Sequence, residues 1–213
     1  MDLSQWLFWN VDTQVDFVYP NGKLYVKDAE KLRPQWKKIT RLAKEKYVRV
    51  VNTCDSHNSN SAEIDPSPDF INTFPEHCMT GTRGADFVKE TEQEDPVIFD
   101  WDKEYLITPE LFDYSKYRNY VIRKDAFDVF AANPYTDIIL SWLKPENVIV
   151  YGVTTNICVD FSVKGLLKRV KNVYVVEDAI KELPNIPLPI DDWISKGVNM
   201  IRLTDLGKMM NRE

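Results

Sequence analysis

The chain alternates between short apolar runs of strand length and longer stretches in which apolar residues recur at helical spacing. The strand-like runs are rich in β-branched and aromatic residues and cover 6–11, 47–53, 120–123, 147–152, 173–176 and 198–201. The helix-like stretches cover 28–46, 134–143, 155–170 and 190–196. This alternation predicts an α/β fold, a doubly wound and mostly parallel sheet with helices on both faces.

One long segment interrupts the alternation. Residues 58–96 show no sustained periodicity and contain prolines at positions 66, 68 and 75. A connection of this length without its own structure is uncommon in a compact domain unless it has a function. We expect a single domain over residues 1–213, with an irregular functional loop or small lobe at about 55–96.

Polar and reactive side chains follow several of the predicted strands. They are Asp12, Asp55, His57, Lys124 and the stretch that leads to Cys158. Ligands of open parallel sheets bind outside the carboxyl ends of the strands. We therefore expect these side chains to meet at one edge of the sheet.

Composition and charge exclude several classes of function. The 213 residues include 27 basic and 33 acidic ones, a net charge of −6. The acidic residues are scattered, so no basic face for nucleic acid or anionic lipid is expected. Apolar runs such as 148–151 are far shorter than the roughly 18 residues of a membrane helix. No basic residue precedes Lys23, unlike the start of a secretory signal, and we expect a cytoplasmic protein.

Glycine-dependent motifs are missing from the sequence. With 7 glycines it contains no G-x-G-x-x-G, no phosphate-binding P-loop and no G-x-S-x-G nucleophile elbow. A dinucleotide or nucleotide cofactor and a serine hydrolase of the α/β type are therefore not expected.

Three cysteines cannot all pair, so at least one thiol is free. Cys158 lies about three residues into a predicted helix, where free N–H groups and the helix dipole favour a thiolate. If Lys124 and Asp12 lie on neighbouring strand ends, the ammonium lowers the pKa of the thiol and the carboxylate takes its proton. The alternative is a buried cysteine that only packs, a turn-forming aspartate and a solvated lysine.

Both histidines lie in or beside the irregular segment, where they suggest a metal site. Alternation along a strand end puts Asp55 and His57 on one side and Cys54 on the other. With His77 and a further carboxylate or water, they form a mixed nitrogen and oxygen set that suits Zn²⁺, Mn²⁺ or Fe²⁺. Two alternatives stay open: a closed zinc site that adds Cys54 and Cys78, and histidines that only form loop hydrogen bonds.

Four sequence strings resemble the isochorismatase-like cysteine hydrolase superfamily. They are VDTQVDF at 11–17, a lysine at 124 followed six residues later by a phenylalanine, GVTTNICV at 152–159 and VEDAI at 176–180. The resemblance spans nearly the whole chain and implies a three-layer α/β/α fold. It also implies a catalytic triad of Asp12, Lys124 and Cys158.

The same resemblance implies an oxyanion site. A non-proline cis peptide between Val153 and Thr154 would turn the Thr154 N–H, together with that of Cys158, toward the developing oxyanion.

Two further strings are similar to the metal site of nicotinamidases and pyrazinamidases: Asp55-Ser56-His57, and the run from Pro75 to Gly84. The resemblance implies Asp55, His57 and His77 as ligands. Glu63 stands where many of these enzymes have a further histidine, and it is the candidate fourth ligand. The loop after Lys124 instead has the shorter spacing of isochorismatase-type members.

The combined interpretation is a hydrolase that converts nicotinamide, or a similar heteroaromatic amide, to the acid and ammonia through a Cys158 thioester. Phe17 and Phe74 are the expected walls for the ring. The resemblance implies a divalent metal, with Zn²⁺ as the first choice and Mn²⁺ or Fe²⁺ as alternatives, and no organic cofactor. It also implies a homo-oligomer and a role in NAD salvage. The alternatives are an isochorismatase-type or other C–N hydrolase with a vestigial metal site, and a non-catalytic binding or assembly subunit.

Overall fold

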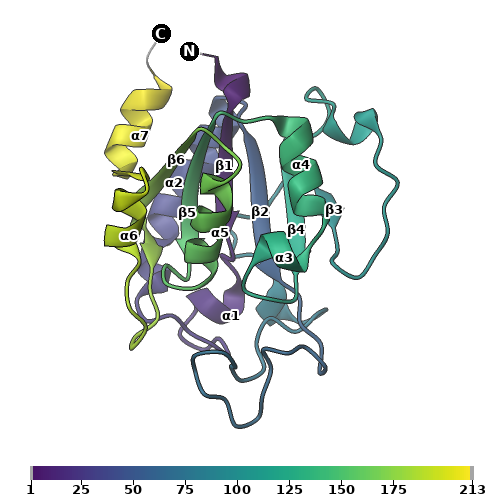
Figure 1. Cartoon of the computed structure of the whole chain (residues 1–213), viewed down its shortest axis with the longest axis vertical. Coiled ribbons are helices and arrows are strands. Elements are labelled where there is room, and N and C mark those ends of the chain that lie inside the picture. Colours follow the sequence, from purple (N-terminus) through teal and green to yellow (C-terminus); the bar gives the residue numbers. More distant parts are fainter. Residues whose placement is uncertain (1, 212–213) are drawn as a thin grey trace.

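A single parallel sheet forms the centre of the molecule (Figure 1). The computed structural model describes residues 2–211, and these form seven strands in the order β3-β4-β2-β1-β5-β6-β7. The strands are β1 (Trp6–Val11), β2 (Arg49–Asp55), β3 (Val97–Phe99), β4 (Asn119–Lys124), β5 (Asn147–Val153), β6 (Asn172–Lys181) and β7 (Asn199–Ile201). Every strand pairs in parallel with its neighbours, as the βαβ pattern predicts.

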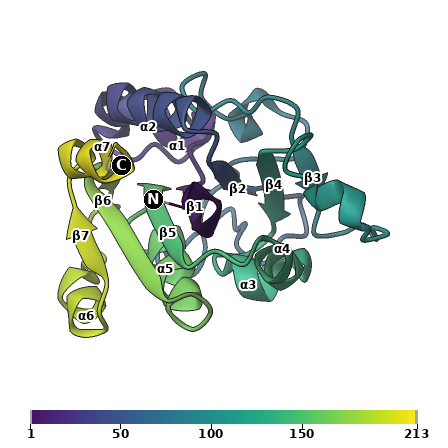
Figure 2. The ribbon, with the colours of Figure 1, turned by 90° about the horizontal axis from the view of Figure 1, so that it is seen from above.

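Helices cover both faces of the sheet and complete a three-layer α/β/α fold. They are α1 (Val15–Val18), α2 (Arg33–Glu45), α3 (Val129–Ala132), α4 (Tyr135–Leu143), α5 (Cys158–Leu167), α6 (Ile190–Ser195) and α7 (Leu203–Met210). Figure 2 shows α1, α2 and α7 on one face and α3, α4 and α5 on the other. None of the helices within residues 2–211 has the length and apolar character that crossing a bilayer requires. The predicted fold class is confirmed.

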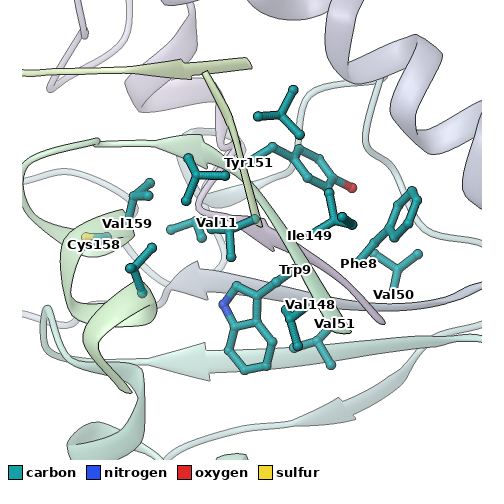
Figure 3. Packing of buried hydrophobic residues seen from close by; sticks show 14 of the residues in the cluster. Phe8, Trp9, Val11, Val50, Val51, Val148, Ile149, Tyr151, Cys158 and Val159 are labelled. Carbon is teal, nitrogen blue, oxygen red and sulfur yellow. The ribbon is translucent and has the colours of Figure 1, made fainter. Parts of the chain in front are cut away.

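The central strands are buried because helices pack on both of their faces. Every residue of β1 is buried, and Figure 3 shows Trp9 and Val11 of this strand among side chains of β2 and β5. The indole of Trp9 stacks on the Phe130 ring from α3, with ring centroids 5.8 Å apart. Burial on both sides explains why the strand is a continuous apolar run rather than an alternating one.

Several element boundaries differ from the sequence prediction. The helix expected over 155–170 begins at Cys158 and ends at Leu167. The helix expected over 28–46 begins as a 3-10 turn at Ala29–Leu32 and becomes α-helical at Arg33. Four short elements, β3, α1, α3 and α7, were not predicted, and three of them span only three or four residues, too few for a periodic pattern.

The irregular segment folds over the carboxyl edge of the sheet. Between residues 56 and 96 the structure contains one 3-10 helix, Arg83–Ala85, and isolated bridges that join His57 to Met79 and Ile64 to Phe74. These bridges hold the start of the segment, around residues 57–64, against residues 74–79, beside the end of β2.

Candidate active site

Four of the predicted site residues meet at the carboxyl edge of the sheet. Asp12 follows β1, Asp55 ends β2, Lys124 ends β4 and Cys158 opens α5 after β5. Because β4, β2, β1 and β5 are adjacent parallel strands, their ends lie side by side. All four residues are at most 5% exposed, so the cluster is shielded from bulk water.

Lys124 is the centre of this cluster. Its Nζ lies 3.0 Å from Asp12 Oδ2, forms a close ion pair with Asp55 Oδ1 and donates to Cys158 Sγ at 3.6 Å. The Thr53 hydroxyl donates to the other Asp12 oxygen at 2.6 Å. The ammonium therefore holds two carboxylates and the thiol around one point.

The surroundings of Cys158 raise the pKa of its thiol, whereas the sequence analysis expected Lys124 and the helix start to lower it. Burial raises the pKa of Cys158, and although Lys124 opposes this rise, Asp12 and Asp55 add to it. Burial and the neighbouring Asp55 also raise the pKa of Asp12 against the effect of Lys124. One ammonium facing two carboxylates has little positive charge left to stabilise a sulfur anion.

The peptide bond between Val153 and Thr154 is cis, as the resemblance implies. It lies between the end of β5 and the start of α5, and Thr154 lines the same pocket as Cys158. The residues named for an oxyanion site are thus next to the thiol.

The predicted metal residues form a second cluster that shares Asp55 with the first. Asp55 Oδ2 lies 3.8 Å from His57 Nε2 and 3.9 Å from His77 Nε2. Ligand atoms of these three residues all lie within 4.8 Å of one another. Glu63 joins them, with Oε2 3.7 Å from His57 Nε2. The structure thus brings all four predicted ligands together.

The donor set fits a divalent cation. The His77 Nδ1 lies 2.8 Å from the Pro75 carbonyl oxygen, which can only accept, so the proton is on Nδ1 and Nε2 is free to coordinate. Among residues 2–211, His57 Nε2 and Glu63 Oε1 are buried polar atoms without a hydrogen-bond partner. Such atoms need a partner, and two imidazoles with two carboxylates are ligands of Zn²⁺ and related ions.

The titration of these groups reflects crowded charge in a buried place. Burial would lower the pKa of His57, but the carboxylates of Asp55, Asp125 and Glu63 outweigh it and raise this pKa to about 9. Burial and the charge of Asp55 raise the pKa of Glu63 to about 8. Burial would also raise the pKa of Asp55, yet Lys124 and the histidines hold it well below its usual value. The carboxylate of Asp55, which both clusters share, therefore keeps its negative charge.

The closed zinc site with two cysteines does not form. Neither Cys54 nor Cys78 belongs to a possible metal-binding group within residues 2–211. Cys78 Sγ instead faces the Gly84 carbonyl at 3.8 Å, and its backbone N–H donates to Asp16.

An apolar pocket opens onto both clusters. The space that it encloses is about 20 Å³, far below the roughly 300–1,000 Å³ of pockets for drug-sized ligands, so the lining side chains have to move before a ring can enter. Polar groups in its lining include Cys158, Thr154 and His77. Its apolar walls are Phe17, Leu24, Phe74, Phe127, Ile157 and Leu183. The two phenylalanines predicted as ring walls both line it.

Two supporting residues were missed in the sequence analysis. The Gln14 side chain accepts from the Asp55 backbone N–H and donates to the Asp55 and Ala85 carbonyl oxygens, at 2.8 to 2.9 Å. Asp125 lies 2.9 Å from His57 Nδ1. Gln14 stands within the VDTQVDF string and Asp125 directly after Lys124, but nothing in the local sequence reveals these partners.

A family model of the Isochorismatase domain matches residues 100–185. No curated protein matches the sequence.

Solved structures share the fold. The chain is similar to the pyrazinamidase of Pyrococcus horikoshii in complex with zinc, with 24% identity over 93% of this chain and 99% of the other and a TM-score of 0.72. It is similar to N-carbamoylsarcosine amidase from Thermoplasma acidophilum, with 21% identity over 93% and 96% and a TM-score of 0.70. It is also similar to PnC1 from L. infantum in complex with nicotinate, with 20% identity over 96% of each chain and a TM-score of 0.71.

Proposed function

We propose that the chain is an isochorismatase-like hydrolase that hydrolyses nicotinamide or a similar small heteroaromatic amide with Cys158 as nucleophile. The match of the Isochorismatase domain over residues 100–185 and the fold shared with the solved structures support this proposal. The observation that carries the proposal is the contact of Lys124 with Cys158, Asp12 and Asp55, beside an apolar pocket that Cys158 and Asp55 line. This is the arrangement of an activated nucleophile with its base and a fixed positive charge.

Acylation begins with a proton transfer within the cluster. Asp12 takes the proton of the thiol as Sγ attacks the amide carbon, and a C–S bond forms. Once Asp12 has taken the proton and is neutral, Lys124 faces only the carboxylate of Asp55 and can stabilise the sulfur anion. The Thr154 and Cys158 N–H groups receive the oxyanion. Asp12 then returns the proton to the amide nitrogen, the C–N bond breaks and ammonia leaves.

Deacylation repeats these steps with water. Asp12 takes a proton from a water molecule, the oxygen attacks the thioester carbon and the C–S bond breaks. The sulfur recovers its proton from Asp12 and the acid is released. No oxidant, reductant or organic cofactor enters the balance.

The metal would be held by Asp55, His57, His77 and Glu63. When bound, a divalent cation there supplies a Lewis-acid contact for a ring nitrogen of the substrate. Phe17 and Phe74 pack on the ring, and the pocket excludes water from the reacting atoms.

The pocket lining favours a neutral substrate over an acidic one. Among residues 2–211, no lysine or arginine lines the pocket, and the nearby Lys124 already pairs with two carboxylates. If the metal site is vestigial, as that alternative assumes, a substrate that carries carboxylates, such as isochorismate, would find no cationic side chain in this lining to pair with. This argues against the isochorismatase-type alternative, although the spacing after Lys124 resembles that group.

Assays of ammonia and acid release test the proposal. We expect the wild-type protein to hydrolyse nicotinamide or pyrazinamide, to lose this activity with a chelator and to regain it with Zn²⁺ or Mn²⁺. The C158A variant should lose turnover by at least 10³-fold with an unchanged circular dichroism spectrum.

Isochorismate and N-carbamoylsarcosine complete the substrate panel. Activity on either of these but on no heteroaromatic amide would contradict the proposed substrate class. Wild-type turnover by C158A would contradict the proposed nucleophile.

A further inference from the structure

We propose that Asp125 is a positioning residue of the metal site, which orients His57 and anchors the turn that carries Glu63. This inference rests on the proposed function, because it concerns the metal that we assign to that site. Asp125 is absent from the pocket lining within the described residues, so its effect must pass through its neighbours.

Asp125 faces His57 from the far side of the metal cluster. Its Oδ1 lies 2.9 Å from His57 Nδ1, and the carboxylate is 19% exposed while the imidazole is fully buried. A carboxylate at Nδ1 holds the proton on that nitrogen and leaves the Nε2 lone pair for a metal. The Nε2 atom accordingly faces Asp55 and Glu63 at 3.8 and 3.7 Å.

The same carboxylate oxygen also accepts a hydrogen bond from the Ser61 hydroxyl. Ser61 Oγ in turn accepts from the Asn58 N–H at 2.8 Å, and the Ser61 carbonyl accepts from the Ile64 N–H at 3.0 Å. This turn carries Glu63, so Asp125 ties a second ligand to the same point. One side chain after Lys124 thus connects the end of β4 with two metal ligands.

The two histidines differ in a way that helps an experiment. Both have an oxygen acceptor at Nδ1, but that of His77 is the Pro75 backbone carbonyl while that of His57 is a side chain. Only the partner of His57 can be removed by mutation. His77 therefore serves as an internal control in the same molecule.

Zn²⁺ affinity, measured by competition with a chromophoric chelator, tests the assignment. We expect D125A to bind Zn²⁺ 10- to 100-fold more weakly than the wild type, the usual effect of removing such a partner. D125N keeps an oxygen acceptor for Nδ1 and should recover part of the loss. The matched control is D128N, which removes a carboxylate three residues away and keeps an N-cap for the Phe130 N–H, and it should bind like the wild type.

A second readout is the nitrogen NMR spectrum of the Zn²⁺-loaded protein, which contains only two histidines. The Nδ1–H signal of His57 should be protected from solvent exchange in the wild type and lose this protection in D125A. The His77 signal should stay unchanged in both. If D125A does not fold, S61A tests the same link, with a smaller loss of Zn²⁺ affinity expected.

The outcomes separate this inference from the proposed function. If the wild type binds Zn²⁺ and D125A shows the same Zn²⁺ affinity and the same Nδ1–H exchange, the role of Asp125 alone is overturned. If D125A does not fold, an unchanged Zn²⁺ affinity of S61A overturns it instead. A wild-type protein that binds neither Zn²⁺ nor Mn²⁺ would overturn the metal site itself and, with it, this role.

Discussion

At the scale of single residues, Lys124 is the side chain on which the site most depends. It is 1% exposed and contacts both Asp12 and Asp55, which are buried as well. Removing an ammonium from water costs desolvation free energy, so an ammonium is buried only where its charge is paired. The lysine therefore stabilises the fold as well as the proposed chemistry.

Replacing this lysine should have a large effect on stability. K124M leaves two carboxylates buried without their cation, and we expect a loss of about 3–5 kcal/mol in the free energy of unfolding, measured with urea. The control K44M removes an exposed partner of Glu94 and should change the stability little. Equal stability of K124M and K44M would contradict the paired state of Lys124.

The identities of the site residues were easier to predict than their protonation states and their hydrogen-bond partners. Asp12, Asp55, Lys124 and Cys158 stand out because each follows a predicted strand, and parallel strands bring their ends together. The charge of the Cys158 thiol was not predictable, because it depends on burial and on the sum of neighbouring charges. Asp125 and Gln14 act through partners 68 and 41 positions away, which no local pattern reveals.

At the scale of elements, α5 is packed closely against α3 through a glycine. A methyl group on Gly165 would lie 2.2 Å from two carbons of the Phe130 ring. That ring is held between Trp9 and the guanidinium of Arg169, which lies 4.0 Å from its centroid. The ring has little freedom to move away.

A pair of glycine variants measures this packing. G165A should lower the stability by about 1–3 kcal/mol because of overpacking. G207A lies in α7 with open space around its added methyl group and should raise the stability by about 0.5–1 kcal/mol. Urea unfolding of both variants checks the opposite signs, and a stabilised G165A would show that α3 and α5 are loosely packed.

The edge pair β3 and β4 is joined by an ion pair with a predictable pH dependence. Asp100, directly after β3, accepts from Arg123 of β4 at 2.7 Å. Burial would raise the pKa of Asp100, but hydrogen bonds from Lys103, Arg123 and Tyr105 lower it to about 2. Because the folded pKa is depressed, the stabilisation is present above about pH 4 and is lost as the pH falls toward 2.

The variant D100N should therefore lose stability only where the carboxylate is ionised. Since Arg123 and Lys103 are 38% and 60% exposed, solvent screening reduces the expected loss at pH 7 to about 1 kcal/mol. At pH 2 the variant and the wild type should unfold at nearly the same urea concentration. A constant difference across this pH range would exclude the ion pair as its cause.

Long elements were predictable and short ones were not. The strands β1, β2, β4 and β5 contain enough apolar residues to stand out, and α2 has a clear apolar stripe. The start of α5 was placed three residues early, because Thr155 and Asn156 resemble helix caps in sequence while the chain is still in a turn there. The order of the strands could not be predicted, because it depends on which helix covers which face.

At the scale of the whole molecule, the irregular segment is held by the sheet edge and supplies His77 and Glu63 to it. These residues and Asp55 bring several donors to one place from distant parts of the chain. A cation that binds this folded arrangement and not the unfolded chain stabilises the whole domain. Metal binding should therefore be visible as a global change.

Thermal unfolding with and without Zn²⁺ measures this coupling. At a free Zn²⁺ concentration of about 100 times Kd, the expected gain is about 2.7 kcal/mol. For a chain of this size it corresponds to a rise in Tm of about 5–10 °C. H77A lacks one ligand and should show a much smaller rise, whereas an equal rise in H77A would place the ion elsewhere.

The side chain of Gln14 has a consequence for redesign of this protein. Gln14 follows the end of β1, and its side-chain amide forms hydrogen bonds with the backbone of Asp55 and with the Ala85 carbonyl oxygen at the same time. The length of this side chain therefore sets the spacing between the sheet and the segment that covers its edge. Asparagine, shorter by one methylene, cannot span that gap. Grafting a different covering loop onto this scaffold will therefore succeed only if the new loop offers a carbonyl oxygen where Ala85 now has one.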